Sequence, residues 1–132
     1  MRATTKKLLA LVVATMFCLQ GCSKVVIDRN VEVGPMEVKH VNVDPPKKEQ
    51  KLKVTIASPD APVNVYIVLE KDIGLASRQM EDFRKPANAL AGQDQASDAT
   101  LEATIPANEG FAILFRHKSQ RAANVRLKID GQ

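Results

Sequence analysis

Short runs in which apolar and polar residues alternate fill most of this chain, and Pro, Gly, Asn or Asp residues interrupt them. A period of two places every second side chain on the same face of an extended strand. The runs lie at 25–33, 36–43, 51–56, 63–69, 100–105, 111–115 and 124–129. This spacing predicts an all-β fold, a small antiparallel sandwich of the jelly-roll or fibronectin-like kind with six to seven strands.

Two of these runs indicate where their strands lie in the sheets. The run 63–69 is apolar on both faces, which predicts a central strand that is buried on two sides. The run 36–43 loses its phase between Val38 and Val41, which predicts a bulge or an edge strand.

One segment, 72–97, breaks the strand pattern. Residues 74–83 are compatible with a short helix, because Leu75, Met80 and Phe83 fall loosely on one side of it. Residues 85–97 are mostly Ala, Asn, Gln and Asp, and we expect a long surface loop there. Loops of this length are often disordered or functional, and both interpretations stay open.

The N-terminus has the three parts of an export signal. Arg2, Lys6 and Lys7 are followed by the apolar run 8–19, and no charge occurs between Lys7 and Lys24. Twelve apolar residues are too few to span a bilayer as a helix, and this length is typical of a signal peptide. We therefore expect residues 1–21 to be a cleaved signal peptide, with an uncleaved membrane anchor as the alternative.

The residues Leu19-Gln20-Gly21-Cys22 follow that apolar run and resemble the lipobox of bacterial lipoproteins. The resemblance implies cleavage by signal peptidase II between Gly21 and Cys22. It also implies a thioether-linked diacylglycerol on Cys22 and a fatty acid, usually palmitate, on the new amine. Two or three acyl chains hold a protein firmly on a membrane. Ser23 follows the cysteine. By the same resemblance, an Asp at this position would favour retention of the lipoprotein in the inner membrane. Because the residue is a serine, we expect the protein in the outer membrane.

The lipobox and the proline pair Pro45-Pro46 divide the chain into three parts. Residues 1–21 are the signal peptide, residues 22–50 a lipid-anchored tether that includes one or two strands, and residues 51–132 the β-sandwich domain. Cys18 leaves with the signal peptide, so lipidated Cys22 is the only cysteine of the mature chain. We therefore expect the mature domain to fold without a disulfide.

Residues 51–130 resemble the small β-sandwich of pre-peptidase C-terminal domains. The resemblance rests on Leu52-x-Val54-x-Ile56 and 63–69 as early strands, Ile105-Pro106-Ala107 with Gly110-Phe111-Ala112-Ile113 as a late hairpin, and Val125-x-Leu127-x-Ile129 as the closing strand. The aspartates usual near the middle strands of that family have no clear counterparts here. The resemblance therefore implies the fold, and no metal or carbohydrate role.

The charge balance argues against nucleic acid as a partner. The whole chain has 19 basic and 15 acidic residues, but three of the basic residues and none of the acidic ones lie in residues 1–21. The mature chain is therefore left with a net charge of only +1, and a strongly basic face is not expected.

Aromatic side chains are scarce after residue 21, where only Phe83, Phe111, Phe115 and Tyr66 occur. Phe111 and Phe115 share a strand face with Ile113, so we expect them in the core. Tyr66 is then the best candidate for an exposed aromatic platform, which sugar-binding and single-stranded nucleic-acid sites use.

Five basic residues fall near the C-terminus, and we place them in a last hairpin: Arg116, Lys118, Arg121, Arg126 and Lys128. Such a cluster is suited to anionic lipid headgroups or to a polyanionic polymer of the envelope. The alternative is a solvated edge that prevents strand-to-strand aggregation. The candidate binding residues are therefore Tyr66, Arg116, Lys118, Arg121 and Arg126.

No motif with a recognisable chemistry occurs in the sequence. His40 and His117 are far apart, and neither has a second ligand at metal spacing, so we expect exposed strand residues and neither a metal nor another cofactor. Phosphate-binding loops, dinucleotide fingerprints and nucleophile elbows do not occur. The acidic pairs Glu81-Asp82 and Glu70 with Asp72 are typical of solvated charges rather than of an acid–base pair.

We therefore predict a protein that is not an enzyme but a lipid-anchored envelope lipoprotein, acting as a binding or structural module. Its expected partners are the membrane, through the lipid on Cys22, and an envelope protein or polymer. One alternative is an accessory subunit of a larger envelope complex, which docks by an exposed strand edge. An exposed apolar patch near Leu75, Met80 and Phe83 would favour this alternative. A carrier of a small ligand or metal, and a small hydrolase, are further alternatives.

Overall fold

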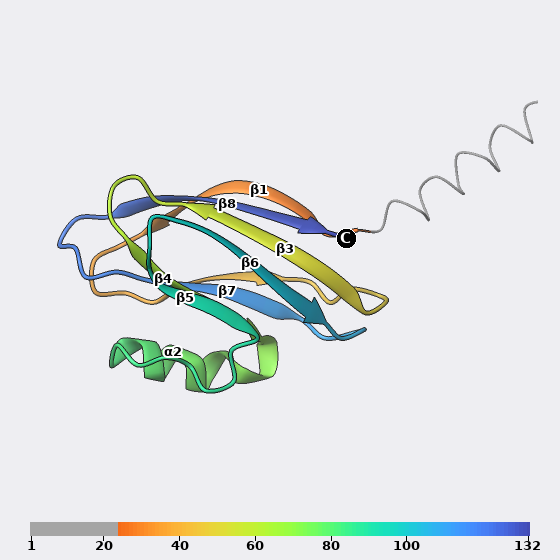
Figure 1. The fold of residues 1–132 in the computed structure, drawn as a ribbon. Helices are drawn as coiled ribbons and strands as arrows, with labels where there is room; N and C mark the ends of the chain where they lie inside the picture. Colours follow the sequence, from red (N-terminus) through yellow and green to blue (C-terminus); the bar gives the residue numbers. More distant parts are fainter. Residues whose placement is uncertain (1–23) are drawn as a thin grey trace, which may run out of the picture.

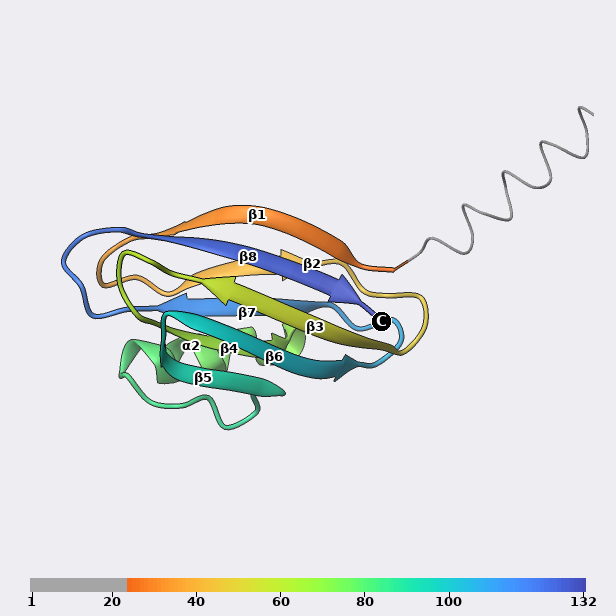
Figure 2. The ribbon, with the colours of Figure 1, turned by 45° about the horizontal axis from the view of Figure 1, so that its top comes forward.

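Two antiparallel four-stranded sheets form the protein in the computed structural model, which describes residues 24–132. The first sheet has the order β1-β8-β3-β6, with bounds Val26–Val33, Ala123–Gly131, Gln50–Ala57 and Asp98–Ile105. The second has the order β2-β7-β4-β5, with bounds Lys39–Val43, Phe111–Arg116, Val63–Leu69 and Ala91–Ala96. The sheets lie face to face (Figures 1 and 2), which confirms the predicted all-β sandwich.

Most connections between consecutive strands cross from one sheet to the other, and only β4 and β5 are both consecutive and paired. The late hairpin expected around residues 105–113 is therefore wrong, since β6 and β7 belong to different sheets. The expected last hairpin is wrong for the same reason, because β7 and β8 are also in different sheets.

The hydrophobic core lies between the two sheets, where the strands bury every second side chain. From the first sheet it contains residues such as Leu52 and Leu127, and from the second Val65, Ile113 and Phe115. The predicted core positions of Phe111, Ile113 and Phe115 are confirmed. Lys51, Lys53 and Lys128 lie on the exposed outer face of the first sheet, where the alternation is polar.

The outer face of the second sheet is covered by α2 (Ile73–Glu81), which follows β4 through a short 3₁₀ helix, η1 (Glu70–Asp72). Ala76 and Met80 of α2 pack on Tyr66, Val68 and Leu114 in a second apolar cluster. This cover buries both faces of β4, and the prediction of a central strand at 63–69 is confirmed. None of the helices within residues 24–132 is both long and apolar enough to cross a membrane.

The expected loop at 85–97 contains a strand, β5, and the sandwich therefore has eight strands rather than six to seven. β5 lies at the edge of the second sheet and most of its side chains face solvent, so its sequence, AGQDQA, has no apolar alternation. A pattern that depends on burial does not reveal a strand of this kind.

The segment expected to act as a tether is mostly folded into the sandwich. β1 pairs along its whole length with β8, and β2 pairs with β7, so each completes one sheet. β2 is an edge strand, as its loss of phase predicts. The folded module therefore begins at β1 and not at residue 51. The signal peptide, the lipobox and Cys22 lie outside the described residues.

Gly92 of β5 lies directly opposite Tyr66 of β4, and the Tyr66 ring packs against its backbone. A Cβ at position 92 would be 2.0 Å from Cδ1 of that ring. We expect Gly92→Ala to lower the free energy of unfolding by about 1–3 kcal/mol, because the buried ring has no room to move. Urea denaturation followed by circular dichroism measures the change, and a loss below about 0.5 kcal/mol, the range of ordinary surface substitutions, would contradict this packing.

Candidate functional site

One aromatic side chain and two basic ones meet near the end of β7, and together they form what we call the Phe83 cluster. Arg116 is the last residue of β7, Lys118 follows it in the loop to β8, and Phe83 comes just after α2. The Arg116 Cζ lies 4.2 Å from the centroid of the Phe83 ring, and the Lys118 Nζ lies 5.3 Å from it. Two of the four basic candidates thus contact Phe83, which the sequence had linked only with an apolar docking patch.

Arg116 is an unusual member of this cluster because it is only 4% exposed. It shares the α2-facing side of β7 with Leu114. Its Nε is buried without a hydrogen-bond partner among residues 24–132, and neither of the two ion pairs in this part of the chain includes it. A buried charge is ordinarily paired with an opposite charge. Here the face of the Phe83 ring, worth about 2 kcal/mol when desolvated, is the one attractive contact observed for the guanidinium.

The end of α2 holds Phe83 in place by two backbone hydrogen bonds. The Phe83 N–H donates to the Met80 carbonyl at 2.9 Å, and the Arg84 N–H donates to the Gln79 carbonyl at 2.8 Å. This is the Schellman arrangement, in which the position of Phe83 is usually occupied by glycine. Phe83 has a φ of 55°, in the left-handed region, which costs an L-residue about 1 kcal/mol.

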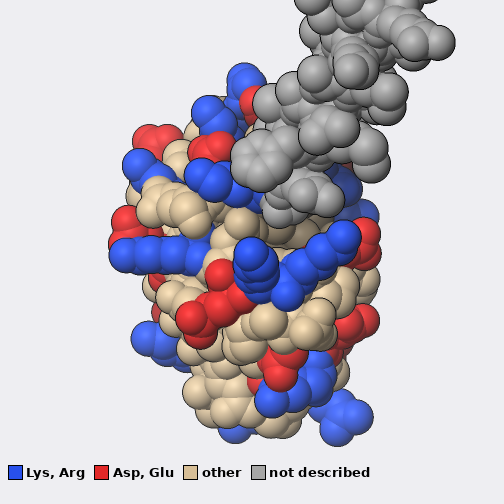
Figure 3. Space-filling view, turned by 90° about the vertical axis from the view of Figure 1, so that its right-hand side faces the viewer, with Lys and Arg blue, Asp and Glu red and all other residues tan. Residues whose placement is uncertain are grey.

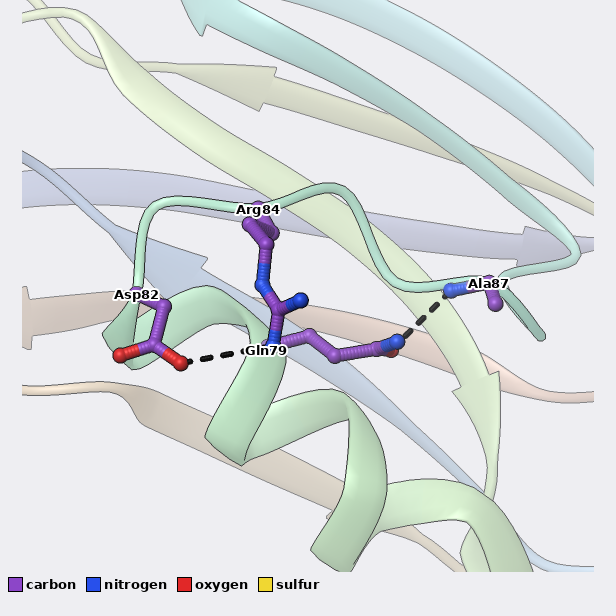
Figure 4. A network of polar contacts seen from close by, with 4 residues as sticks. All are labelled: Gln79, Asp82, Arg84 and Ala87. Atoms are coloured by element: carbon purple, nitrogen blue, oxygen red, sulfur yellow. Dashed lines mark hydrogen bonds and ion pairs between the residues drawn. The ribbon is translucent and has the colours of Figure 1, made fainter.

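Side chains also support the segment after α2, as Figure 4 shows. The Gln79 Oε1 accepts a hydrogen bond of 3.1 Å from the Ala87 N–H. Arg84 and Asp82 form an ion pair of 3.5 Å between Nη2 and Oδ2. The ion pair is solvent-exposed and contributes little, so the backbone bonds and the Gln79 contact do most to place Phe83.

The other two basic candidates do not join the Phe83 cluster. Arg126 lies on β8, in the other sheet, and its Nη2 is 3.3 Å from the Asp28 Oδ2 of β1. Arg121 is exposed in the β7–β8 loop, where its backbone N–H donates to the Ser119 Oγ at 3.2 Å. The five C-terminal cations therefore do not form one surface, because β7 and β8 carry them into different sheets.

The expectation of an exposed platform at Tyr66 is wrong. Tyr66 is 1% exposed, since α2 covers its face of β4. Its hydroxyl donates to the Asp94 Oδ1 of β5. Burial raises the pKa of the Tyr66 phenol, and the hydrogen bond and negative charge of Asp94 raise that pKa further. Tyr66 is a structural residue that joins β4, β5 and α2.

The expected exposure of the two histidines is right for His40 and wrong for His117. His117 is buried, and its Nδ1 accepts a hydrogen bond of 3.1 Å from the Ser119 N–H. The other ring nitrogen, Nε2, therefore donates to the Val33 carbonyl at 2.9 Å. His117 joins the β7–β8 loop to the end of β1. No group of three or more possible metal ligands occurs within residues 24–132.

The end of the sandwich where β1 begins carries charges of both signs, as Figure 3 shows. Lysine and arginine side chains alternate there with acidic ones. Lys24 and Lys47 line a groove of about 460 Å³ at this end, together with Asp44 and several apolar residues. The mixed charge gives this face no strong field toward a polyanion.

Comparison with known proteins identifies the fold and no family. No protein-family model matches the sequence, and no curated protein matches it. The solved structures with a similar fold include the following three. The Yersinia pseudotuberculosis-derived mitogen has a TM-score of 0.55 at 9% identity, with 82% of this chain and 86% of that chain covered. The pre-peptidase C-terminal domain of a Bacillus anthracis collagenase has a TM-score of 0.52 at 7% identity, with 80% of this chain and 88% of that chain covered. Aeromonas hydrophila PliG, a periplasmic inhibitor of g-type lysozyme, has a TM-score of 0.53 at 13% identity, with 86% of this chain and 90% of that chain covered.

These identities support a common fold and nothing finer. The likeness to a pre-peptidase C-terminal domain confirms, at the level of the fold, the resemblance noted in residues 51–130. The match covers 80% of this chain, a larger share than residues 51–130 alone.

Proposed function

We propose that this protein is a lipid-anchored, non-catalytic binding module of the bacterial cell envelope. In this proposal Cys22 carries the lipid, the outer membrane holds the protein, and the Phe83 cluster meets an envelope protein. The observation that carries the proposal is the placement of the cluster at the end of the sandwich opposite to the start of β1.

The strand register defines these two ends. Val26, at the start of β1, pairs with Asp130, whereas Val33, at its other end, pairs with Ala123 and accepts the hydrogen bond from His117. Arg116 directly precedes His117, so it lies at the Val33 end. An eight-residue strand is about 25 Å long, and this length separates the cluster from the start of β1.

The anchor is close to the folded module. Cys22 precedes Val26 by four residues, which reach at most about 14 Å when extended. The lipid would therefore hold the start of β1 near the membrane surface, and the Phe83 cluster would face away from it. This arrangement favours a protein or polymer in the periplasm or outside the cell over a lipid headgroup as the partner of the cluster.

The comparisons support a binding role at the level of the fold. One structure of similar fold is a periplasmic protein that inhibits a lysozyme, and another is the pre-peptidase C-terminal domain of a collagenase. The fold therefore occurs in a periplasmic inhibitor and in a domain attached to an enzyme. In this chain the binding role rests on the Phe83 cluster.

The accessory-subunit alternative has one observation in its favour. Of the three apolar residues that would mark a docking surface, Leu75 is 50% exposed and Phe83 is 40% exposed, whereas Met80 is buried in the contact with the second sheet. Two of the three predicted residues are therefore exposed, as a docking surface on and beside α2 would require.

The lipid anchor is tested by labelling cells with a radioactive or clickable fatty acid. We expect the label on the wild-type chain, and we expect Cys22→Ser to remain an unlabelled, uncleaved precursor, because a serine hydroxyl does not accept the glyceryl group. Cys18→Ser is the matched control, since Cys18 lies in the part of the signal that is removed, and it should be labelled normally. Normal labelling of Cys22→Ser would exclude the anchor.

The binding role is tested by capture of partners from detergent-solubilised envelope. The bait is the lipidated chain, with Lys118→Glu beside it and Arg121→Glu as the control in the same loop. A protein that binds the wild type and the control, but not Lys118→Glu, supports the proposal. If every bound protein is retained equally by Lys118→Glu, the Phe83 cluster is not the binding site.

A further inference from the structure

Arg116 is the feature of this molecule that the fold does not explain. The side chain is almost completely buried, yet its Nε has no hydrogen-bond partner within residues 24–132. A planar guanidinium has five N–H donors in a fixed fork, and this geometry matches two oxygens of one carboxylate. An apolar residue at this position would pack beside Leu114 without leaving a buried donor unsatisfied.

Lys118 brings a second positive charge to the same Phe83 ring. Its Nζ and the Arg116 Cζ both lie within 5.3 Å of the centroid of the Phe83 ring. Two like charges near one ring repel each other, and an anion that contacts both would offset this repulsion. No acidic residue of the described chain forms an ion pair with either cation.

The Phe83 ring covers the Arg116 guanidinium, with the Arg116 Cζ 4.2 Å from the ring centroid. Its ring is partly exposed, so it can turn toward solvent without opening the core. Its backbone is in the left-handed region, which a phenylalanine rarely adopts and a glycine adopts readily. The residue with the strained backbone is therefore the one whose ring contacts the buried cation, and strain of this kind is often found at ligand-binding positions.

We propose that the Phe83 ring swings away to expose an anion site, in which a carboxylate group of a protein partner binds Arg116 through two parallel hydrogen bonds and contacts Lys118. This rests on the binding role proposed above and names its chemistry. The carboxylate belongs to an Asp or Glu side chain or to a C-terminus. A flat carboxylate with two oxygens fits the planar fork of a single guanidinium beside an aromatic ring.

The test is a titration of the mature lipidated chain in detergent micelles, with sodium acetate as the probe. Inorganic phosphate is the second probe, and sodium chloride at matched ionic strength is the reference. The readout is the NMR signal of the Arg116 Nε–H, which is buried and therefore exchanges slowly. We expect a saturable shift with acetate in the millimolar range, and no saturable shift with chloride.

Three variants make the result specific. Phe83→Ala removes the cover, and we expect it to bind acetate about threefold or more tightly, because no ring competes for Arg116. Lys118→Gln should weaken binding by about threefold or more, since one of the two charges is lost. Arg121→Gln is the matched control, an exposed cation of the same loop that is outside the cluster, and its affinity should equal that of the wild type.

The proposal is overturned by any of three results. The first is the absence of a saturable acetate response in both the wild type and Phe83→Ala. The second is an equal loss in Lys118→Gln and Arg121→Gln, which would indicate nonspecific attraction. The third is tighter binding of phosphate than of acetate, which would make this a phosphate site. If the chain captures a partner but shows no saturable acetate binding, the carboxylate site is wrong and the proposed binding role stands. If the chain binds acetate as expected but captures no partner, the carboxylate site stands and the proposed binding role is wrong.

Discussion

A fragment that starts at residue 51 is expected to show no cooperative unfolding transition. It lacks β1 and β2, and therefore leaves the paired edges of β8 and β7 without their hydrogen-bond partners. It also removes Val31, Val33, Val41 and Val43 from the core between the sheets. Burial of four valines stabilises a fold by about 6–12 kcal/mol, which is comparable to the whole stability of a domain of this size.

Urea denaturation followed by circular dichroism measures this effect, and a chain of residues 24–132 is the control. We expect the control to unfold in one sharp transition, and the shorter fragment to change gradually or to aggregate through its open edges. A sharp transition in the fragment would show that six strands are sufficient and that residues 22–50 act as a tether after all.

The second large effect is expected for Ile113→Ala. Ile113 is fully buried on β7, and it pairs with Val41 of β2 on one side and with Ile67 of β4 on the other. Loss of its branched side chain leaves a cavity that these strands cannot close, because hydrogen bonds hold them on both sides. We expect the free energy of unfolding to fall by about 2–5 kcal/mol.

Leu127→Ala tests the same core from the opposite sheet and should give a loss in the same range, because Leu127 is also fully buried, on β8. Leu75→Ala is the control for both, since Leu75 is half exposed on α2 and its truncation should cost less than about 1 kcal/mol. Chemical denaturation of the three variants under one condition makes the comparison. A loss below about 1 kcal/mol for Ile113→Ala would place that residue outside the core.

Seven of the eight strands can be predicted from the sequence, because each buries at least one face and so carries apolar residues at a period of two. The run 111–115 is an example, since its alternation of Phe111, Ile113 and Phe115 follows directly from one face packing against the other sheet. The short helix at 74–83 was predictable for the related reason that Met80 must face an apolar surface.

The errors share one physical origin, which is contact between segments far apart in the chain. Tyr66 is polar enough for a surface and apolar enough for a core, and only the cover by α2 decides between the two. His117 is buried because the end of β1 supplies an acceptor for its ring 84 positions earlier in the chain. β5 is a strand because β4 is available beside it, and its own sequence carries no such preference.

The candidate site also depends on contacts between segments that are far apart in the chain. Arg116 and Lys118 could be recognised as basic residues at the end of a strand, but not as members of one cluster with Phe83. Their meeting depends on how α2 ends, since two backbone hydrogen bonds at Met80 and Gln79 direct the Phe83 ring toward β7. Arg126 has the same charge and a similar place in the sequence, yet it lies in the other sheet beside Asp28.

The sequence by itself therefore determined the class of the fold, most of its strands and its core, because these depend on local periodicity and on the burial of one face. It also predicts an exported, lipidated chain, since the lipobox is read as a short linear motif. Only the tertiary structure decided that β1 and β2 belong to the sandwich, and which cations meet. Strand order and the meeting of side chains are set by pairing across the chain, and a linear pattern does not encode which of several similar strands will be neighbours.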